Sequence, residues 1–328
     1  MASEVDLQTV YIETLLKGKE MPLRDSDSFR HVLAQCIAPV HERVEPYLIR
    51  HAVANLTEEA AGDMVDELLS GHSGHVLPSV QPYRSLFSSD SILREGSPQA
   101  TDPLFIGFEA TARGLLQDGR VAEAGKLFWT NRRRHDELDL AVTEGAIRLG
   151  KALNGLRADN PLSVSTNATS ALLNRNDFAS KILRLLEGLD FDPNHLVVEI
   201  LEDNDFTVNA QEQFSQLKIL VQEGVRLSMD DLGRKKSLQN LKIMSEQTIP
   251  VAEVKFDGED TAQMKDRSHW SHIDELLHYS QKAGATTVVW EGYWKGVESS
   301  MLEAVREYHL ESSVGQQWDS PLFEGTIV

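Results

Sequence analysis

The chain has 328 residues and a single cysteine, Cys36. One thiol cannot build a disulfide framework or supply the several thiolates of a zinc or iron–sulfur centre. Long apolar runs are also missing. The N-terminal residues lack a basic segment followed by an apolar one, and no run approaches the roughly 20 residues that span a bilayer. These absences predict a cytoplasmic protein without membrane insertion.

Basic residues are few compared with acidic ones. The sequence has 32 Lys and Arg against 51 Asp and Glu, which gives a formal net charge of −19 at pH 7. A potential of this sign repels DNA, RNA and anionic membranes, so we expect none of them as a partner. A phosphorylated small ligand stays compatible with this charge, because bound metal ions reverse the local sign of a pocket.

The first part of the chain, residues 1–72, has apolar residues at helical spacing in several successive segments. The glycine-containing segment Gly71–Gly74 ends this pattern. We predict a small helical region that supports a homodimer or binds a partner protein. A helical cap packed on the following domain is an equal alternative. Residues 73–328 would form the second domain.

From residue 103 onward, short β-branched apolar runs alternate with helical patterns. This alternation is typical of βα units around a parallel sheet, and the second domain has the length of a (β/α)8 barrel of about 250 residues. An α/β protein with a TIM-type barrel is therefore expected. The predicted strands cover residues 75–83, 103–108, 162–166, 196–198, 225–229, 251–254, 286–290 and 312–317. The predicted helices cover residues 135–153, 176–186, 211–223, 238–244, 272–283 and 298–307.

Several of the predicted strands run into a polar residue. In a (β/α)8 barrel the carboxyl ends of the strands meet on one face, which is where active sites lie. Mg²⁺, Mn²⁺ and Ca²⁺ prefer oxygen ligands. Two such ions side by side stabilise the attacking and leaving oxygens in phosphoryl transfer. The pattern therefore predicts metal-dependent hydrolysis of a phosphodiester. The polar residues are Glu109, Asn167, Glu199, Asp230, Asp231, Lys255 and Glu291.

Each of these residues also has a plain structural interpretation. A single acid at the end of a strand is usually a helix N-cap or a solvated loop residue. Asn167 fits the N-cap of a helix that starts at Ala168, and Lys255 alone fits an exposed strand end. Trp290 and Trp294 either stack on a purine or pack against neighbouring helices. The joint pattern is what favours the metal site.

Short motifs in a fixed order then point to a family. Over residues 75–325 the chain resembles the EAL-domain proteins, the family of cyclic-di-GMP phosphodiesterases, as a divergent member. Glu109-Ala110-Thr111, with Arg113 after it, resembles the family's Glu-Ala-Leu motif. The other matching segments are Gln81-Pro82, Ser165-Thr166-Asn167, Glu199-Ile200-Leu201-Glu202, Met229-Asp230-Asp231-Leu232-Gly233, Val254-Lys255-Phe256-Asp257 and Val289-Trp290-Glu291-Gly292.

The resemblance implies a modified TIM barrel with one antiparallel strand, and hydrolysis of cyclic di-GMP to linear pGpG with Mg²⁺ or Mn²⁺. The metal ligands would be Glu109, Asn167, Glu199 and Asp231, together with Asp230, which would also bind a second ion. Support of the nucleophilic water would fall to Lys255 and Glu291, and support of the loop after Asp231 to Glu202. Contacts with the nucleotide would fall to Gln81, Arg113 and Trp294.

The chain departs from the family pattern at three places. The loop after the paired aspartates, small and flexible in the family, reads Arg234–Ser237 here. Trp294 replaces a glutamate, and Val314 replaces the glutamine of a C-terminal Gln-Gly pair. A catalytically inactive EAL-like protein that binds cyclic di-GMP or a partner protein, as a sensor or regulator, is therefore the alternative hypothesis. A barrel hydrolase acting on another phosphoester is a third.

Overall fold

The computed structural model describes residues 74–85, 105–116, 121–123, 134–155, 161–206, 210–234, 236–293, 298–318 and 321–325. The predicted helical region 1–72 and Trp294 lie outside these residues, and so does the domain boundary predicted at residues 72 and 73. What was predicted for them stays a prediction. The chain divides into two compact units, Met1–Ser79 with Ala110–Pro161 and Val80–Glu109 with Leu162–Val328.

The described residues of the first unit include parts of two long strands, one short strand and one long helix. β2 and β3 pair antiparallel, with Arg113 opposite Glu123. Helix α5 buries apolar side chains that recur every three or four residues between Leu138 and Leu153, which confirms the helix predicted there. The bounds of these elements are β1 Gly74–Ser85, β2 Phe105–Leu116, β3 Val121–Glu123 and α5 His135–Gly155.

The second unit is built on a sheet whose strands follow the order β1-β9-β8-β7-β6-β5-β4-β2. Neighbours from β4 to β9 are parallel, whereas β1 is antiparallel to β9. β1 also pairs with β2, which joins the two ends of this order. The arrangement confirms the TIM-type barrel. The further strands are β4 Ser163–Ala168, β5 Leu196–Ile200, β6 Arg226–Met229, β7 Glu253–Phe256, β8 Thr287–Tyr293 and β9 Leu322–Gly325.

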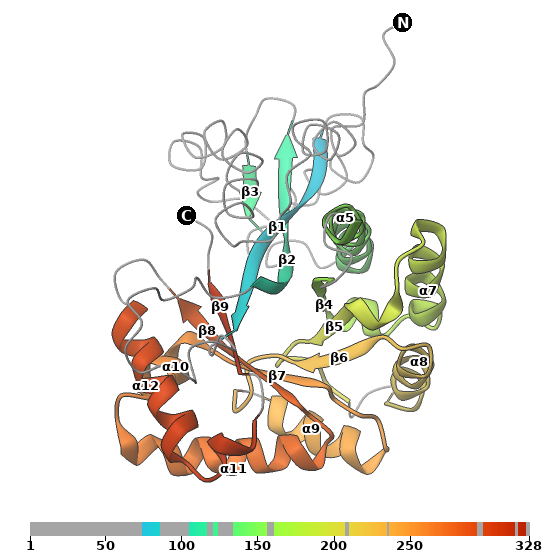
Figure 1. Cartoon of the computed structure of the whole chain (residues 1–328). Helices are drawn as coiled ribbons and strands as arrows, with labels where there is room; N and C mark the ends of the chain where they lie inside the picture. The colour runs from blue at the N-terminus through green and yellow to red at the C-terminus, as the bar shows by residue number, and fades with distance from the viewer. Residues whose placement is uncertain are drawn as a thin grey trace, which may run out of the picture. The chain divides into compact units, whose positions relative to one another are not determined.

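Helices cover the outside of these strands, as Figure 1 shows for α7, α8, α9, α11 and α12. Each follows a strand, which confirms the predicted βα alternation. No helix among the described residues is long and apolar enough to cross a membrane. The helical elements of this unit are α6 Ser170–Leu173, α7 Phe178–Leu189, η1 Pro193–His195, α8 Ala210–Gln222, α9 Ser237–Glu246, α10 Gly258–Gln263, η2 Arg267–His269, α11 Trp270–Lys282, α12 Glu298–Glu311 and η3 Gly315–Gln317.

The central strands are buried along their whole length. Every residue of β5 is buried, and so is every residue of β7, although β7 contains Glu253 and Lys255. A parallel strand covered on both faces is normally an unbroken apolar run. Two ionisable side chains in one such strand therefore need partners inside the barrel.

Residues 312–317 do not form the last strand, so that prediction was wrong. The strand is β9, and the segment before it is the short helix η3. The Ser312 hydroxyl accepts hydrogen bonds from the backbone N–H groups of Val314 and Gly315, each at 3.2 Å. A serine that binds nearby backbone in this way offers the chain an alternative to a strand.

Trp290 belongs to the core. Its ring stacks on Phe256 with the centroids 4.7 Å apart, and its Nε1 donates to His309 Nε2 at 3.0 Å. The other nitrogen of His309, Nδ1, lies 3.0 Å from the carbonyl oxygen of Gly315. Because Trp290 is fully buried, it packs inside the protein and is not available to stack on a purine.

Candidate metal centre

Lys255 lies at the centre of the candidate site. Its side chain is 1% exposed, and its Nζ lies 2.6 Å from Glu109 Oε2, 2.7 Å from Glu291 Oε1 and 3.1 Å from Glu199 Oε2. Asp230 Oδ1 lies at 3.8 Å. One ammonium thus joins carboxylates from β2, β8, β5 and the end of β6. The interpretation of Lys255 as an exposed strand end was wrong.

Asn167 completes this group from β4. The parallel register of β4 and β5 sets Asn167 beside Glu199. Its Nδ2 donates to Glu109 Oε1 at 2.7 Å, while its Oδ1 is buried and has no hydrogen-bond partner among the described residues. Asn167 is not an N-cap, because α6 begins after Thr169. A buried amide oxygen without a donor is suited to a cation.

Glu199 has two hydrogen-bond donors that the sequence did not assign to it. The Tyr83 hydroxyl donates to Glu199 Oε1 at 2.9 Å, and the Ser165 hydroxyl donates to the same oxygen. Tyr83 is buried on β1, two residues after Gln81. Because side chains two apart on a strand share a face, Gln81 lies on the face of β1 that Tyr83 turns toward the site. The strand periodicity after Gln81 was the signal that would have identified Tyr83.

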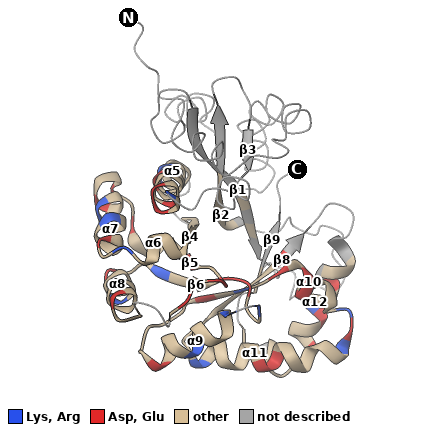
Figure 2. Cartoon of the chain, turned by 180° about the vertical axis from the view of Figure 1, so that it is seen from behind, with Lys and Arg blue, Asp and Glu red and all other residues tan. Residues whose placement is uncertain are grey.

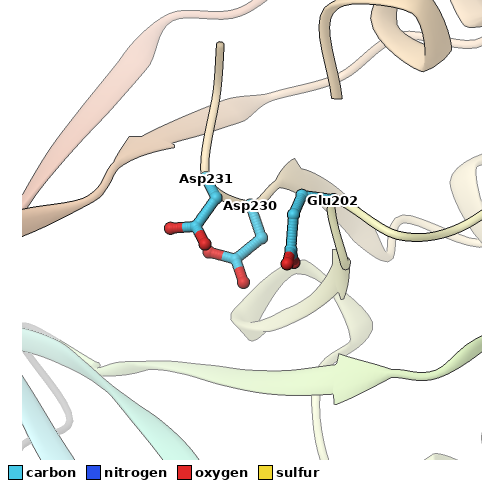
Figure 3. A group of neighbouring side chains, drawn as sticks. All are labelled: Glu202, Asp230 and Asp231. Carbon is cyan, nitrogen blue, oxygen red and sulfur yellow. The ribbon is translucent and has the colours of Figure 1, made fainter. Parts of the chain in front are cut away.

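Asp230 and Asp231 follow β6 where the chain turns. Their carboxylate oxygens and one of Glu202 lie within 4.8 Å of one another, and Figure 3 shows the three carboxyl groups pointing to the same side. Asp231 has a left-handed backbone with φ +43°, and Gly233 follows with φ +96°. Asp adopts this conformation more readily than most residues. The turn predicted from Gly233 is confirmed, and it brings both aspartates to one place.

The carboxyl groups outnumber the cations around them. Lys255 lies within 3.8 Å of four of them, Glu109, Glu199, Asp230 and Glu291, whereas Glu202 and Asp231 lie beside Asp230. Figure 2 shows acidic residues among the central strands as well as on the helices. Burial raises the pKa of Glu199 to about 8, with repulsion from Glu109 adding to the effect. Burial likewise raises the pKa of Asp231 to about 7, and it raises the pKa of Asp230 and of Glu291. Raised pKa values in a group of carboxylates indicate a shortage of positive charge, which divalent cations would supply.

The three predicted nucleotide contacts are described to different degrees. Gln81 lies on β1 and is partly buried. Arg113 lies on β2, where its backbone is opposite Glu123, but its side chain is outside the described part of the structure. Trp294 falls wholly outside it. The roles of these three residues stay predictions.

Comparison with known proteins identifies the family. The EAL domain model matches residues 98–301, so this chain belongs to the EAL-domain family. The comparison with curated proteins finds no significant match.

Solved EAL structures share the fold. The PaMucR phosphodiesterase in complex with c-di-GMP matches with a TM-score of 0.60 at 16% identity, over 81% of this chain and 94% of that one. An EAL domain protein from Listeria monocytogenes EGD-e gives a TM-score of 0.57 at 20% identity, over 80% and 90%. The Xanthomonas citri FimX EAL domain in complex with c-diGMP gives a TM-score of 0.58 at 17% identity, over 82% of this chain and 91% of that one.

Proposed function

We propose that this protein hydrolyses one phosphodiester bond of cyclic di-GMP to give linear pGpG, using Mg²⁺ or Mn²⁺. The observation that carries the proposal is the convergence of Glu109, Glu199 and Glu291 on the buried Lys255, together with Asn167 Oδ1, which has no hydrogen-bond partner among the described residues. Membership of the EAL-domain family supports the substrate, and so do the relatives solved with cyclic di-GMP.

The oxygen donors fit a hard divalent cation. Carboxylates and an amide oxygen suit Mg²⁺ and Mn²⁺ better than soft-ligand metals, and a manganese complex is known for the related BlrP1 of Klebsiella pneumoniae. When bound, such ions lower the pKa of water and stabilise charge on phosphoester oxygens. The residues that would hold them are Glu109, Asn167, Glu199, Asp231 and, between two ions, Asp230.

The remaining groups would have the roles that the family resemblance implies. The Lys255 ammonium orients Glu109, Glu199 and Glu291, and its charge can neutralise a phosphate oxygen. Burial raises the pKa of Glu291, which brings this carboxylate closer to the range suited to a general base. Glu202 holds the turn of the two aspartates. Gln81, Arg113 and Trp294 would contact the nucleotide.

The second candidate is an EAL-like protein that binds cyclic di-GMP or a partner protein without hydrolysis. The observation behind it is the charged loop after Asp231. Arg234 in this loop pairs with Asp257, Glu259 and Asp260, where the resemblance implies a small and flexible segment. A loop held in this way can preserve binding while slowing turnover.

A product assay tests the proposal. Purified full-length protein is incubated with cyclic di-GMP and Mn²⁺, and the products are separated by chromatography. We expect pGpG from the wild type and none from Glu109→Ala, while Glu144→Ala, which changes an exposed acid on α5, retains activity. Calorimetry with cyclic di-GMP separates the other outcomes. Binding without pGpG would support the sensor, and the absence of binding would leave a protein partner or another phosphoester.

The cellular setting is part of the same proposal. A cytoplasmic enzyme would meet cyclic di-GMP where this second messenger acts, and a net charge of −19 suits a protein that avoids nucleic acids. Residues 1–72 would support a homodimer or receive a partner protein. Light scattering on the full chain and on a chain lacking these residues tests the dimer, because a monomeric full chain would exclude it.

A further inference from the structure

The turn after β6 carries two of the proposed metal ligands, and it also carries Arg234. We infer that Arg234 is a positioning residue that holds Asp230 and Asp231 in place for metal binding by tying their turn to the turn after Lys255. The inference rests on the proposed metal site and concerns a residue outside it. The contacts of Arg234 lie within one chain, so a single chain would hold the two aspartates in place without a partner.

Arg234 reaches an acidic group at the start of α10. Its Nη2 donates to Asp257 Oδ1 at 3.2 Å and to Glu259 Oε2 at 2.8 Å. Its Nε lies 2.6 Å from Asp257 Oδ2, where the attraction is ionic because the hydrogen is poorly aligned for a bond. Asp260 Oδ2 lies 3.8 Å from Nε. The guanidinium therefore faces three carboxylates, and two of its nitrogens approach Asp257.

Asp257 is itself fixed with respect to Lys255. It follows Lys255 by two residues and is the N-cap of α10, where its Oδ1 accepts the backbone N–H of Asp260 at 2.8 Å. The backbone N–H of Leu232 donates to the carbonyl oxygen of Lys255 at 2.8 Å. The ionic contact of Arg234 thus reinforces a backbone link between the same two segments.

The other end of Arg234 is fixed to the aspartates. Its backbone N–H donates to the carbonyl oxygen of Asp231 at 2.9 Å. The Ser237 hydroxyl donates to the carbonyl oxygen of Arg234 at 2.8 Å and accepts the N–H of Gly233 at 2.9 Å. The backbone of Arg234 is therefore part of the turn, and the contact of its guanidinium with Asp257 connects this turn to the start of α10.

The turn needs such support. Asp231 has a left-handed backbone, which costs free energy for a residue with a side chain, and its carboxyl group lies among others of the same charge. Lys236 provides a second contact, because its N–H donates to the carbonyl oxygen of Glu202 at 3.1 Å and its Nζ pairs with Asp205. Arg234 and Lys236 therefore hold the turn from two sides.

The sign of the effect distinguishes positioning from simple electrostatics. Removing a positive charge near a cation site strengthens cation binding if charge alone matters. Removing a positioning residue weakens it, because the two aspartates then sample arrangements that do not fit the ion. Arg234→Gln therefore has opposite expected effects under the two accounts.

Calorimetric titration of the metal-free full-length protein with Mn²⁺ provides the test. We expect the dissociation constant of Arg234→Gln to rise about fivefold, which corresponds to roughly 1 kcal/mol and to the upper end for a partly exposed ion pair. Arg234→Lys keeps the charge without the fork of two nitrogens, so we expect a smaller rise. Arg267→Gln is the control, because it removes an exposed arginine that pairs with Glu307 and Glu311, and its affinity should equal that of the wild type.

An Mn²⁺ affinity of Arg234→Gln equal to or above that of the wild type would overturn the inference while leaving the proposed function intact. A wild type that binds no Mn²⁺ would overturn the proposed function, and the inference with it. Circular dichroism checks the fold of each variant. Should Arg234→Gln not fold, Arg234→Lys decides, and wild-type affinity in that variant counts against the inference.

Discussion

Replacing Lys255 with methionine removes the ammonium on which the carboxylates of the site converge. Methionine keeps most of the volume, so the change tests charge rather than packing. Glu109, Glu199 and Glu291 each lie within 3.1 Å of this ammonium, whose side chain is 1% exposed. Removing one partner from a buried ion pair costs about 3–5 kcal/mol, because the remaining charge is left in an apolar surrounding.

The cost should depend on pH in a defined direction. Lys255 lowers the pKa of Glu199, which burial nonetheless raises from 4.5 to about 8. Without the ammonium this pKa rises further. A carboxyl group with a raised pKa binds its proton more tightly in the folded state, so the folded state loses stability as the pH rises from the unfolded value through the folded one. The penalty of Lys255→Met is therefore larger above pH 8, where Glu199 ionises in the wild type, than near pH 6.

Urea denaturation of metal-free protein measures this penalty. We expect the free energy of unfolding to fall by about 3–5 kcal/mol above pH 8 and by less near pH 6, with Mn²⁺ restoring part of the loss. Lys181→Met is the control, because the exposed pair of Lys181 with Asp177, at 3.7 Å, is worth at most about 0.5 kcal/mol. Equal stability of Lys255→Met and wild type above pH 8, or a larger penalty near pH 6, would refute this reasoning.

Three further predictions concern single residues. Tyr83→Phe removes a donor to the charged form of Glu199, so it should cost about 1 kcal/mol of stability and move the pH midpoint of Mn²⁺ binding upward, as titrations at several pH values would show. An unchanged midpoint would argue against the role of Tyr83. Glu109→Ala should abolish Mn²⁺ binding and turnover, whereas Glu202→Ala should weaken both only partly, and the reverse order in calorimetry would contradict the assignment. Burial lowers the pKa of His309 from 6.5 to about 4. This histidine should therefore cost the wild type about 3 kcal/mol of stability as the pH falls from about 6.5 to 4. Denaturation curves of His309→Phe should not show this loss.

The parts of the site that were predictable are those fixed by chain order. Glu199 and Asp230 each follow a short apolar run, and parallel strands bring such positions to one region of a barrel. The sequence also indicated the turn after Asp231, because Gly233 marks a backbone with positive φ. These features depend on periodicity and on local conformation, which a single sequence carries.

The parts that were missed depend on contacts between distant segments. Tyr83 reads as an ordinary core aromatic, and its hydrogen bond to Glu199 joins residues 116 positions apart. The hydrogen bond of Ser165 to Glu199 likewise joins distant segments of the chain. The false strand at residues 312–317 arose because Ser312 can satisfy two backbone N–H groups, which hydrophobic patterning does not register. The periodicity of β1 shows that Tyr83 shares a face with Gln81, but it does not identify the partner of that side chain across the barrel.

The charged loop bears on both functional hypotheses in an unexpected way. From the sequence, Arg234 was a departure that favoured an inactive protein, yet its contacts with Asp257 act on the turn that carries Asp231. A site that had lost metal binding would not need the contact of Arg234 with Asp257, because aspartates that bind no cation repel one another. Either a phosphodiesterase or a sensor built on this site should then bind its nucleotide more tightly with Mn²⁺ than without it, since the phosphates would share the ion. A purely protein-binding descendant has no reason to keep four carboxyl groups within 3.8 Å of one buried lysine.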